Sequence, residues 1–206
     1  MVKLFALEGI DGAGKTTIFK ALQRTLPNVN TRSEPNEAER SGRWLREQIS
    51  SDRPPEMDTL MFAAHHVEVA WRYAPTAGCD CYVTDRSSHV SMYAYQIHRL
   101  WDSHSFDDYQ QSPKEWISNI LAPIGRRPDH VIHLYVDVDT AIERVDGKEK
   151  YERREQLEQT KAYYDLMPEY LPYDPEWHFV DARGRADQTL DQVLAIFESE
   201  GIEVER

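Results

Sequence analysis

The chain has 206 residues, with 24 lysines and arginines against 36 aspartates and glutamates, which gives a formal net charge of −12. This length suits a single domain over residues 1–206, and a hydrophobic content of 40% can fill one core. So acidic a chain repels nucleic-acid backbones, which argues against a nucleic-acid polymer as partner but not against a small anionic ligand. No apolar run reaches the length of a membrane span, and the N-terminus lacks a signal-peptide pattern, so we expect a cytoplasmic protein that does not associate with a membrane.

Short apolar runs alternate along the chain with longer segments of helical periodicity. Strands are predicted at residues 4–7, 29–33, 81–84, 131–136 and 179–180. Helices are predicted at about 18–26, 37–49, 57–72, 88–101, 113–121 and 190–197. The polar segments 50–56 and 102–112 are predicted loops, and the charged tract 143–158 is predicted to form a short lid, at about 144–152, and then a helix.

This alternation predicts an α/β fold in which a parallel sheet of about five strands is covered by helices on both faces. Ligands of such sheets bind beyond the carboxyl ends of the strands. We therefore expect functional residues directly after positions 7, 33, 84, 136 and 180.

Two cysteines, Cys79 and Cys81, are too few for a disulfide scaffold. They flank one residue of a predicted strand, so we expect both side chains on one face. A zinc site would need His65 and His66 as further ligands, and buried structural thiols are the simpler interpretation.

The segment Gly9–Thr16 fits the phosphate-loop pattern G-x-x-x-x-G-K-[ST], between a predicted strand and a predicted helix. Its glycines let backbone N–H groups turn toward phosphate oxygens, and the helix N-terminus adds a favourable field. Lys15 can reach the β- and γ-phosphates of ATP, and the Thr16 hydroxyl can ligate Mg²⁺. The motif predicts a P-loop NTPase fold, with ATP bound by Gly9, Asp11, Gly12, Ala13, Gly14, Lys15, Thr16 and Thr17.

The residues that follow the predicted strand 131–136 indicate which class of NTPase this is. After Val136 the chain reads Asp137-Val138-Asp139, where a GTPase would carry a guanine-reading Asn/Thr-Lys-x-Asp segment. The chain is also short for most motor ATPases. A small phosphotransferase is the better class.

The segment 7–17 is similar, almost letter for letter, to the phosphate loop of thymidylate kinases. Further segments resemble that family in the same order: Glu34-Pro35, Leu60–Ala64, Asp85-Arg86 with Ala94-Tyr95-Gln96, Leu134–Asp139, and Asp181-Ala182. The resemblance covers about residues 3–198. It implies transfer of the γ-phosphate of ATP to deoxythymidine monophosphate (dTMP), with magnesium, by an enzyme of a family whose members are usually homodimers.

The resemblance also implies roles for the matching positions. The predicted catalytic residues are Lys15, Asp85, Arg86 and Arg144, and the predicted magnesium ligands are Thr16 and Asp85, partly through water. The predicted acceptor-binding residues are Asp11, Glu34, Phe62, His66, Arg86, Tyr95 and Gln96. Arg86 would hold the acceptor's phosphate bidentately, Asp11 would accept a hydrogen bond from its 3′-hydroxyl, and Phe62 would stack on its base. The sequence leaves open that Phe62 is a core residue and that Asp85 and Arg86 form a structural ion pair.

Two positions depart from the family pattern. His66 stands where the family has an arginine that reads the base, and Ser87 stands where a tyrosine or histidine is usual. A neutral imidazole offers one donor and no permanent charge, so the preferred base, including a modified pyrimidine, stays open. The alternative is that His66 faces away and that His65, one helical position earlier, or a more distant arginine reads the base.

The phosphate loop carries no arginine, and members of the resembled family with such a loop usually supply cations from the lid. The resemblance therefore implies lid cations from Arg144, Lys148 and Lys150. Acidic residues are interleaved with these cations. The alternative is therefore a solvent-exposed helix whose charged side chains form ion pairs with one another.

Two rival functions remain open on the sequence alone. The first is a deoxynucleoside kinase, in which Glu34 would act as general base on a sugar 5′-hydroxyl. The second is a non-catalytic nucleotide-binding protein with the same fold. A monophosphate acceptor is already ionised and needs only positioning and charge neutralisation, and Asp11 in the loop favours that function.

Overall fold

The computed structural model describes residues 2–49, 51–72, 78–103 and 111–205. Its strands form one all-parallel sheet in the order β2-β3-β1-β4-β5. They are β1 (Lys3–Glu8), β2 (Val29–Ser33), β3 (Cys81–Asp85), β4 (His130–Tyr135) and β5 (Glu176–Asp181). The predicted five-stranded α/β sheet is confirmed.

The strand register aligns the carboxyl ends of β1, β2 and β3. Leu7 of β1 lies opposite Asp85 of β3, and Ser33 of β2 lies opposite the same Asp85. The residues that directly follow these strands therefore meet at one edge of the sheet. The central strands β1 and β3 are covered on both faces, which explains why they read as continuous apolar runs.

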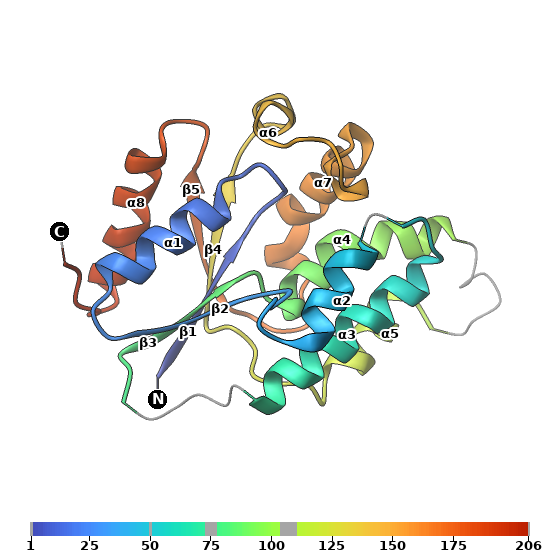
Figure 1. Ribbon diagram of the computed structural model, residues 1–206, viewed down its shortest axis with the longest axis horizontal. Helices are drawn as coiled ribbons and strands as arrows, with labels where there is room; N and C mark the ends of the chain where they lie inside the picture. Colours follow the sequence, from blue (N-terminus) through green and yellow to red (C-terminus); the bar gives the residue numbers. More distant parts are fainter. Residues whose placement is uncertain (1, 50, 73–77, 104–110, 206) are drawn as a thin grey trace.

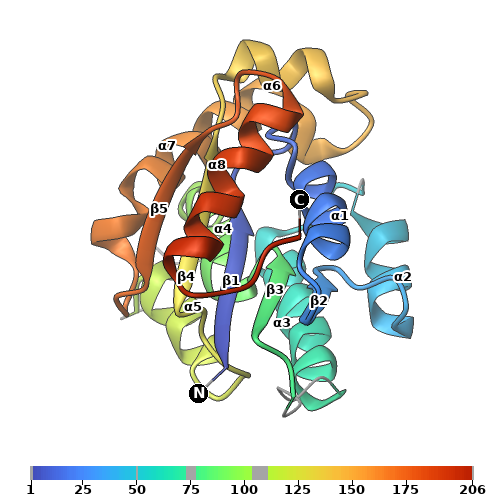
Figure 2. The same cartoon turned by 90° about the vertical axis from the view of Figure 1, so that its left-hand side faces the viewer.

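Helices cover both faces of the sheet, as predicted (Figure 1). On one face lie α1 (Lys15–Thr25) and α8 (Ala186–Ser199), which pack against each other. On the other lie α4 (Ser88–Asp102) and α7 (Arg154–Tyr170), and beyond them α2 (Arg40–Gln48), α3 (Pro55–Arg72) and α5 (Pro113–Leu121). Figure 2 shows β5 at an outer edge of the sheet, beside α7 and α8. None of the helices in the described part of the chain combines the length and apolar character that a bilayer crossing requires.

The predicted lid region has more structure than the sequence indicated. The short helix α6 (Val138–Arg144) follows β4 directly and was missed as an element. Asp137 caps it by accepting a hydrogen bond from the Thr140 backbone N–H at 2.8 Å. A single 3₁₀ turn, η1 (Lys150–Glu152), precedes α7. A seven-residue helix carries too few turns for its periodicity to be recognised in a charged sequence.

Three further expectations are wrong or concern residues outside those described. Helix α2 begins at Arg40, three residues later than predicted, because Glu39 still has an extended backbone. Cys79 precedes β3, so the two cysteines do not share a strand face, and only Cys81 is buried. Most of the predicted loop 102–112 lies outside the described residues.

Candidate active site

The phosphate loop joins β1 to α1 and needs glycine at two close approaches. Gly9 and Gly12 have φ angles of 136° and 82°, in the region that favours glycine. A Cβ atom at these positions would collide with the backbone carbonyl oxygens of Leu134 and Ala141. The loop is thus folded tightly against the end of β4 and the middle of α6.

Lys15 lies buried inside this loop, with 6% of its surface exposed. Its Nζ donates to the carbonyl oxygens of Gly9, at 2.9 Å, and Ile10, at 2.7 Å. Burial, and after it the positive charge of Arg86, lowers the pKa of Lys15 to about 8. The ammonium is therefore held in place over the loop, ready to be shared with phosphate oxygens.

Thr16 and Asp85 come together as predicted from separate elements. The Thr16 hydroxyl, at the start of α1, donates to Asp85 Oδ2 at 3.0 Å, and Asp85 ends β3. Both groups offer oxygen ligands at the entrance to the helix, and oxygen is the ligand that Mg²⁺ prefers. The donor set fits a magnesium ion bound beside ATP.

Arg86, which directly follows β3, lies against the phosphate loop and against Tyr95 of α4. Its guanidinium bonds to Asp11 Oδ1, lies 3.4 Å from the Gly9 carbonyl oxygen, and sits 4.8 Å above the centre of the Tyr95 ring. Burial alone would raise the pKa of Asp11, but the positive charges of Arg86 and Lys15 hold it below its ordinary 3.8. Arg86 also has a φ of 74°, a strained value for a residue with a side chain, of the kind that clusters at functional sites.

Glu8, the last residue of β1, is fully buried directly behind Arg86. Its carboxylate accepts hydrogen bonds from the Ser87 backbone N–H at 2.7 Å, the Ser91 hydroxyl at 2.8 Å and the Tyr164 hydroxyl at 2.7 Å. Burial raises the pKa of Glu8 to about 7, in spite of the nearby Arg86. The sequence analysis missed this role, because a strand-end glutamate becomes buried only through partners from distant helices.

An open cavity lies between the phosphate loop, α2, α3, α4 and η1. Its apolar lining comes from Pro35, Ile49, Phe62 and Met92. Its polar and aromatic lining includes Asp11, Glu34, Arg46, His65, Arg86, Tyr95, Gln96, Glu149 and Tyr151. The structure thus brings together Asp11, Glu34, Phe62, Arg86, Tyr95 and Gln96 of the predicted acceptor residues.

His66 is the exception among the predicted acceptor residues. It is 2% exposed and does not line the cavity; its Nδ1 lies 3.2 Å from Glu34 Oε1, and its ring packs edge-on against His89. His65 lines the cavity instead. Adjacent residues on a helix point about 100° apart, so the structure turns His65 rather than His66 toward the cavity, and base reading by His66 stays a prediction.

His65 faces the cavity with both of its nitrogens already engaged. Nε2 accepts from the Asn36 backbone N–H at 2.9 Å, and Nδ1 lies 2.6 Å from the Ser41 hydroxyl. Since a backbone N–H can only donate, Nε2 carries no proton and the ring is neutral. Burial likewise lowers the pKa of His65. The imidazole holds α2 and the loop before it in place.

Glu34 is anchored from several sides at the floor of the cavity. Arg32 donates to it at 2.6 Å, and Ser88 donates through its backbone N–H at 2.9 Å and its hydroxyl at 2.7 Å. Burial alone would raise the pKa of Glu34, but His66 and Arg32 hold it well below its usual range. A carboxylate so stabilised is a poor proton acceptor.

The lid segment is held to α3 and α4 by a buried charge cluster. Lys150 is 5% exposed and donates to Asp58 Oδ2 at 2.6 Å. Arg99 donates to the same oxygen at 2.7 Å and to the Tyr151 hydroxyl at 3.0 Å. Gln96 donates to that hydroxyl at 3.1 Å. Tyr151 is thereby fixed as a wall of the cavity, and Lys150 is an anchor rather than a free cation.

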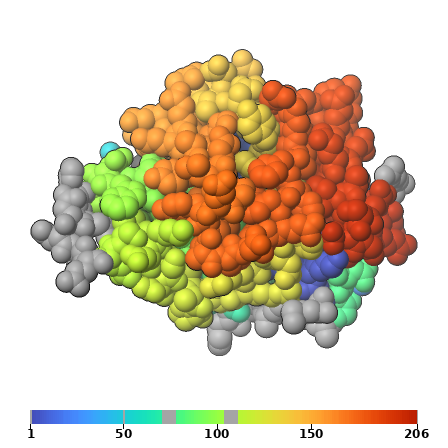
Figure 3. Space-filling model, turned by 180° about the vertical axis from the view of Figure 1, so that it is seen from behind, coloured from blue at the N-terminus to red at the C-terminus, as the bar shows by residue number. Residues whose placement is uncertain are grey.

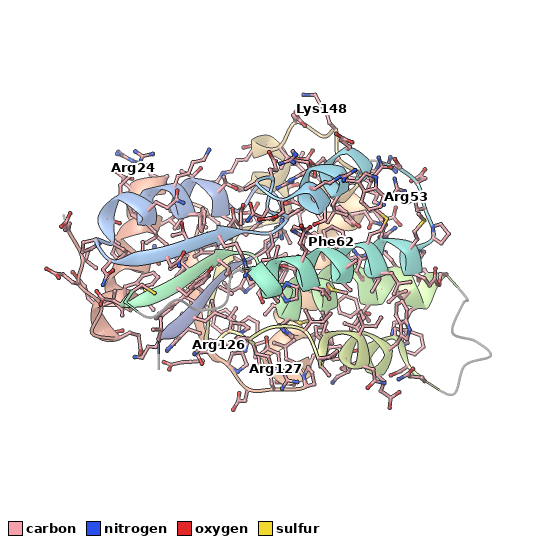
Figure 4. All side chains as sticks on the ribbon, turned by 60° about the horizontal axis from the view of Figure 1, so that its bottom comes forward. Arg24, Arg53, Phe62, Arg126, Arg127 and Lys148 are labelled. Carbon is pink, nitrogen blue, oxygen red and sulfur yellow. The ribbon has the colours of Figure 1, made fainter. Side chains whose placement is uncertain are left out.

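The other two predicted lid cations also point elsewhere in this structure. The Arg144 guanidinium donates to the carbonyl oxygens of Ala182, Arg183 and Gly184, at 2.8, 2.9 and 3.2 Å. Lys148 is exposed and pairs with Asp146, and Figure 4 shows it projecting from the surface. Neither residue lines the cavity, so a catalytic role for Arg144 stays a prediction.

Arg46 of α2 is a cavity cation that the sequence analysis missed. It lines the cavity beside the lid segment, and its Nη1 lies 3.8 Å from Glu149 Oε1. Arg46 and Ile49 share a helix face at a spacing of three residues, a signal that was present in the sequence but did not distinguish this arginine from its neighbours. Phe62, labelled on α3 in Figure 4, lines the same cavity.

A family model described as thymidylate kinase matches residues 7–193. The chain belongs to the thymidylate kinase family. It is 30% identical over 172 residues to the probable thymidylate kinase of Halobacterium salinarum, covering 82% of this chain and 83% of that protein. It is 31% identical over 202 residues to the probable thymidylate kinase of Methanocorpusculum labreanum, covering 92% and 94%. The thymidylate kinase of Brachyspira hyodysenteriae is 29% identical over 202 residues, covering 93% of this chain and 91% of that protein.

The fold agrees with that family. The solved structure of thymidylate kinase from Candida albicans superimposes with a TM-score of 0.74 at 20% identity, covering 100% of this chain and 98% of that one. The predicted family, the P-loop fold and the enzyme class are therefore confirmed. Thymidylate kinases are phosphotransferases that use ATP, and this chain carries the phosphate loop that such chemistry requires.

Proposed function

We propose that this member of the thymidylate kinase family transfers the γ-phosphoryl group of ATP to dTMP or a closely related pyrimidine deoxynucleotide. The observation that carries the proposal is the position of Arg86. It lies between the phosphate loop and a cavity with aromatic walls, beside Asp11 and above Tyr95. A cation at this junction can hold the acceptor's phosphate next to the phosphoryl group to be transferred.

On the donor side, the roles follow from charge and position. Lys15 would neutralise charge on the β- and γ-phosphates as the phosphoryl group moves. Thr16 and Asp85 would hold Mg²⁺, directly or through water, and the bound ion would neutralise phosphate charge. No general base is needed, because the attacking phosphate oxygen is already ionised.

On the acceptor side, side chains would orient the nucleotide. Arg86 would bind its phosphate bidentately, with Arg46 adding positive charge from α2. Phe62 would stack on the base, and Asp11 would accept a hydrogen bond from the 3′-hydroxyl. Tyr95 and Tyr151, whose rings meet edge to face with centroids 5.5 Å apart, would close the cavity around the sugar and base.

A deoxynucleoside kinase is disfavoured by the surroundings of Glu34. Arg32 and Ser88 already donate three hydrogen bonds to its carboxylate, and its pKa lies far below that of a useful base. A nucleoside 5′-hydroxyl would have to displace one of these donors before it could lose its proton to Glu34.

We also propose that the enzyme works as a homodimer. Met57, Leu60 and Val67 form an exposed apolar stripe on α3, each with about half of its surface exposed, at spacings of three and seven residues. A helix face of this kind is suited to packing against the same face of a second copy. Sedimentation velocity distinguishes a monomer from a dimer. A dimer is expected for the wild type and a monomer for Leu60→Glu. A monomeric wild type would contradict the proposed homodimer.

The test of the activity is a panel of acceptors assayed with ATP and Mg²⁺ for ADP release. The panel contains the deoxynucleoside and ribonucleoside monophosphates of thymine, uracil and cytosine, together with the matching nucleosides. We expect dTMP to give the highest kcat/KM and the nucleosides to give no turnover. Turnover of thymidine but not of dTMP would establish the nucleoside kinase, and no turnover of any acceptor would indicate a binding protein.

A further inference from the structure

A second cluster of ligand-type side chains lies at the other end of the sheet. His130 begins β4, and Glu176 begins β5 directly opposite it in the strand register. His178 follows two residues later, so its side chain lies on the same face of β5 as Glu176. In a parallel sheet the amino ends of the strands lie away from the carboxyl ends, so this cluster is separate from the acceptor cavity. In Figure 2, β5 lies at the outer edge of the sheet, and Figure 3 shows the surface that α7, β5 and α8 form together.

The distances within this cluster match those between ligands of one metal ion. His130 Nδ1 lies 3.2 Å from His178 Nε2, and the Glu176 carboxylate oxygens lie 3.6 Å from the first and 3.8 Å from the second. Zinc binds imidazole nitrogen at about 2.0–2.1 Å in tetrahedral geometry, which separates two ligand atoms by about 3.3 Å. The two nitrogens already have that separation. The two glutamate distances involve different oxygens, Oε2 and Oε1, so the exposed Glu176 side chain has to rotate to bring one oxygen close to both nitrogens.

The surroundings of His130 hold its ring in the orientation that a metal ligand needs. The ring is buried and stacks on Phe5, with centroids 4.5 Å apart and planes 11° from parallel. Its other nitrogen, Nε2, lies 3.6 Å from Glu200 Oε2, and Lys3 bonds to the same carboxylate. A histidine that binds a metal through one nitrogen usually directs the other toward a carboxylate, which fixes the tautomer.

From this geometry we propose that His130, His178 and Glu176 form a binding site for a divalent transition metal ion of the zinc type. Two imidazoles and one carboxylate favour Zn²⁺ over Mg²⁺ or Ca²⁺, which prefer oxygen ligands. Because the Glu176 side chain is exposed, solvent water could supply a fourth ligand. The bound ion cross-links the edge strand β5 to β4, and it stabilises the fold at the end of the sheet farthest from the reaction.

The alternative explanation of the 3.2 Å contact is a hydrogen bond between the two imidazoles, with no metal involved. Metal titration separates the two. Protein without a polyhistidine tag is titrated with Zn²⁺ against a chromophoric chelator, in excess Mg²⁺ so that oxygen sites are saturated. Titration with Co²⁺ alone then reports the geometry, because tetrahedral Co²⁺ gives intense visible absorption bands.

We expect one equivalent of Zn²⁺ to bind, and His178→Gln to weaken binding by at least about 100-fold. Glu200→Gln, which leaves all three ligands in place, should weaken it by about tenfold. Cys79→Ser and Glu203→Gln are the controls and should bind as the wild type does, which excludes a cysteine site and a nonspecific carboxylate site. Unchanged phosphoryl transfer by His178→Gln shows that the variant is folded.

Three results would overturn the proposal. They are a wild type without stoichiometric Zn²⁺ binding, binding that survives unchanged in both His178→Gln and Glu200→Gln, and binding that is lost in Cys79→Ser. The first result would leave the imidazole hydrogen bond as the explanation of the contact.

Discussion

The donor and acceptor sides of the active site are built in different ways. On the donor side, the backbone of one continuous loop forms most of the site, and its glycines are required by close contacts with β4 and α6. On the acceptor side, side chains from α2, α3, α4 and η1 converge on a cavity, and buried ion pairs fix their positions. A backbone site can be recognised from a short motif, whereas a site of converging side chains depends on how each helix is rotated. Mutations should separate the two kinds of site.

The largest effect is expected on the donor side, from Lys15→Ala. The variant loses the ammonium proposed to neutralise the transferring phosphoryl group, and kcat should fall by about 1,000-fold, or about 4 kcal/mol in the barrier. Lys148→Ala is the matched control, because Lys148 is exposed and pairs with Asp146 away from the cavity lining. Steady-state assay with dTMP checks both variants. A Lys15→Ala enzyme within a few-fold of the wild type would contradict the assigned role.

Glu8, at the boundary between the two sides, should make stability depend on pH. Its pKa is about 7 in the folded protein against an ordinary 4.5, so the folded state binds more protons between those values. The free energy of unfolding should therefore fall, by about 3 kcal/mol, as the pH rises through this range. Glu8→Gln cannot ionise and should lose this slope, while the exposed Glu203→Gln should keep it. Urea denaturation across the pH range measures it, and equal slopes in all three proteins would refute the explanation.

Arg86→Ala should show the dependence of the acceptor side on one cation. Because the guanidinium is proposed to contact the acceptor's own charge, kcat/KM for dTMP should fall by about 50-fold, with a raised KM for dTMP. The KM for ATP should change much less. Determining both Michaelis constants distinguishes this from a general loss of fold. An effect confined to ATP would move Arg86 to the donor side.

The smallest effect is expected from the lid anchor, in Lys150→Met. Loss of the bond to Asp58 frees the segment that carries Tyr151, so the KM for dTMP should rise by about tenfold with a smaller change in kcat. Lys148→Met, two residues away and exposed, should match the wild type. If both lysine variants bind dTMP equally well, the buried cluster does not position the cavity wall.

The sequence was sufficient to predict the sheet, the phosphate loop and the strand ends that carry Glu34, Asp85 and Arg86. These follow from hydrophobic runs and glycine spacing, which are local signals. It was not sufficient to decide whether His65 or His66 faces the cavity, because a shift of one residue turns a helical side chain by about 100°. The burial of Glu8 and Lys150 was also unpredictable, since a charged residue becomes buried only when distant elements supply its partners.

The central claim is that the acceptor is a monophosphate rather than a nucleoside. The most direct test is a competition in which dTMP and thymidine, at equal concentrations, share one reaction with ATP and Mg²⁺. Chromatography then follows the formation of dTDP and the consumption of thymidine. The account predicts that dTDP accumulates while thymidine is untouched. Consumption of thymidine ahead of dTMP would contradict it, and would require Glu34 to act as a base in spite of its lowered pKa.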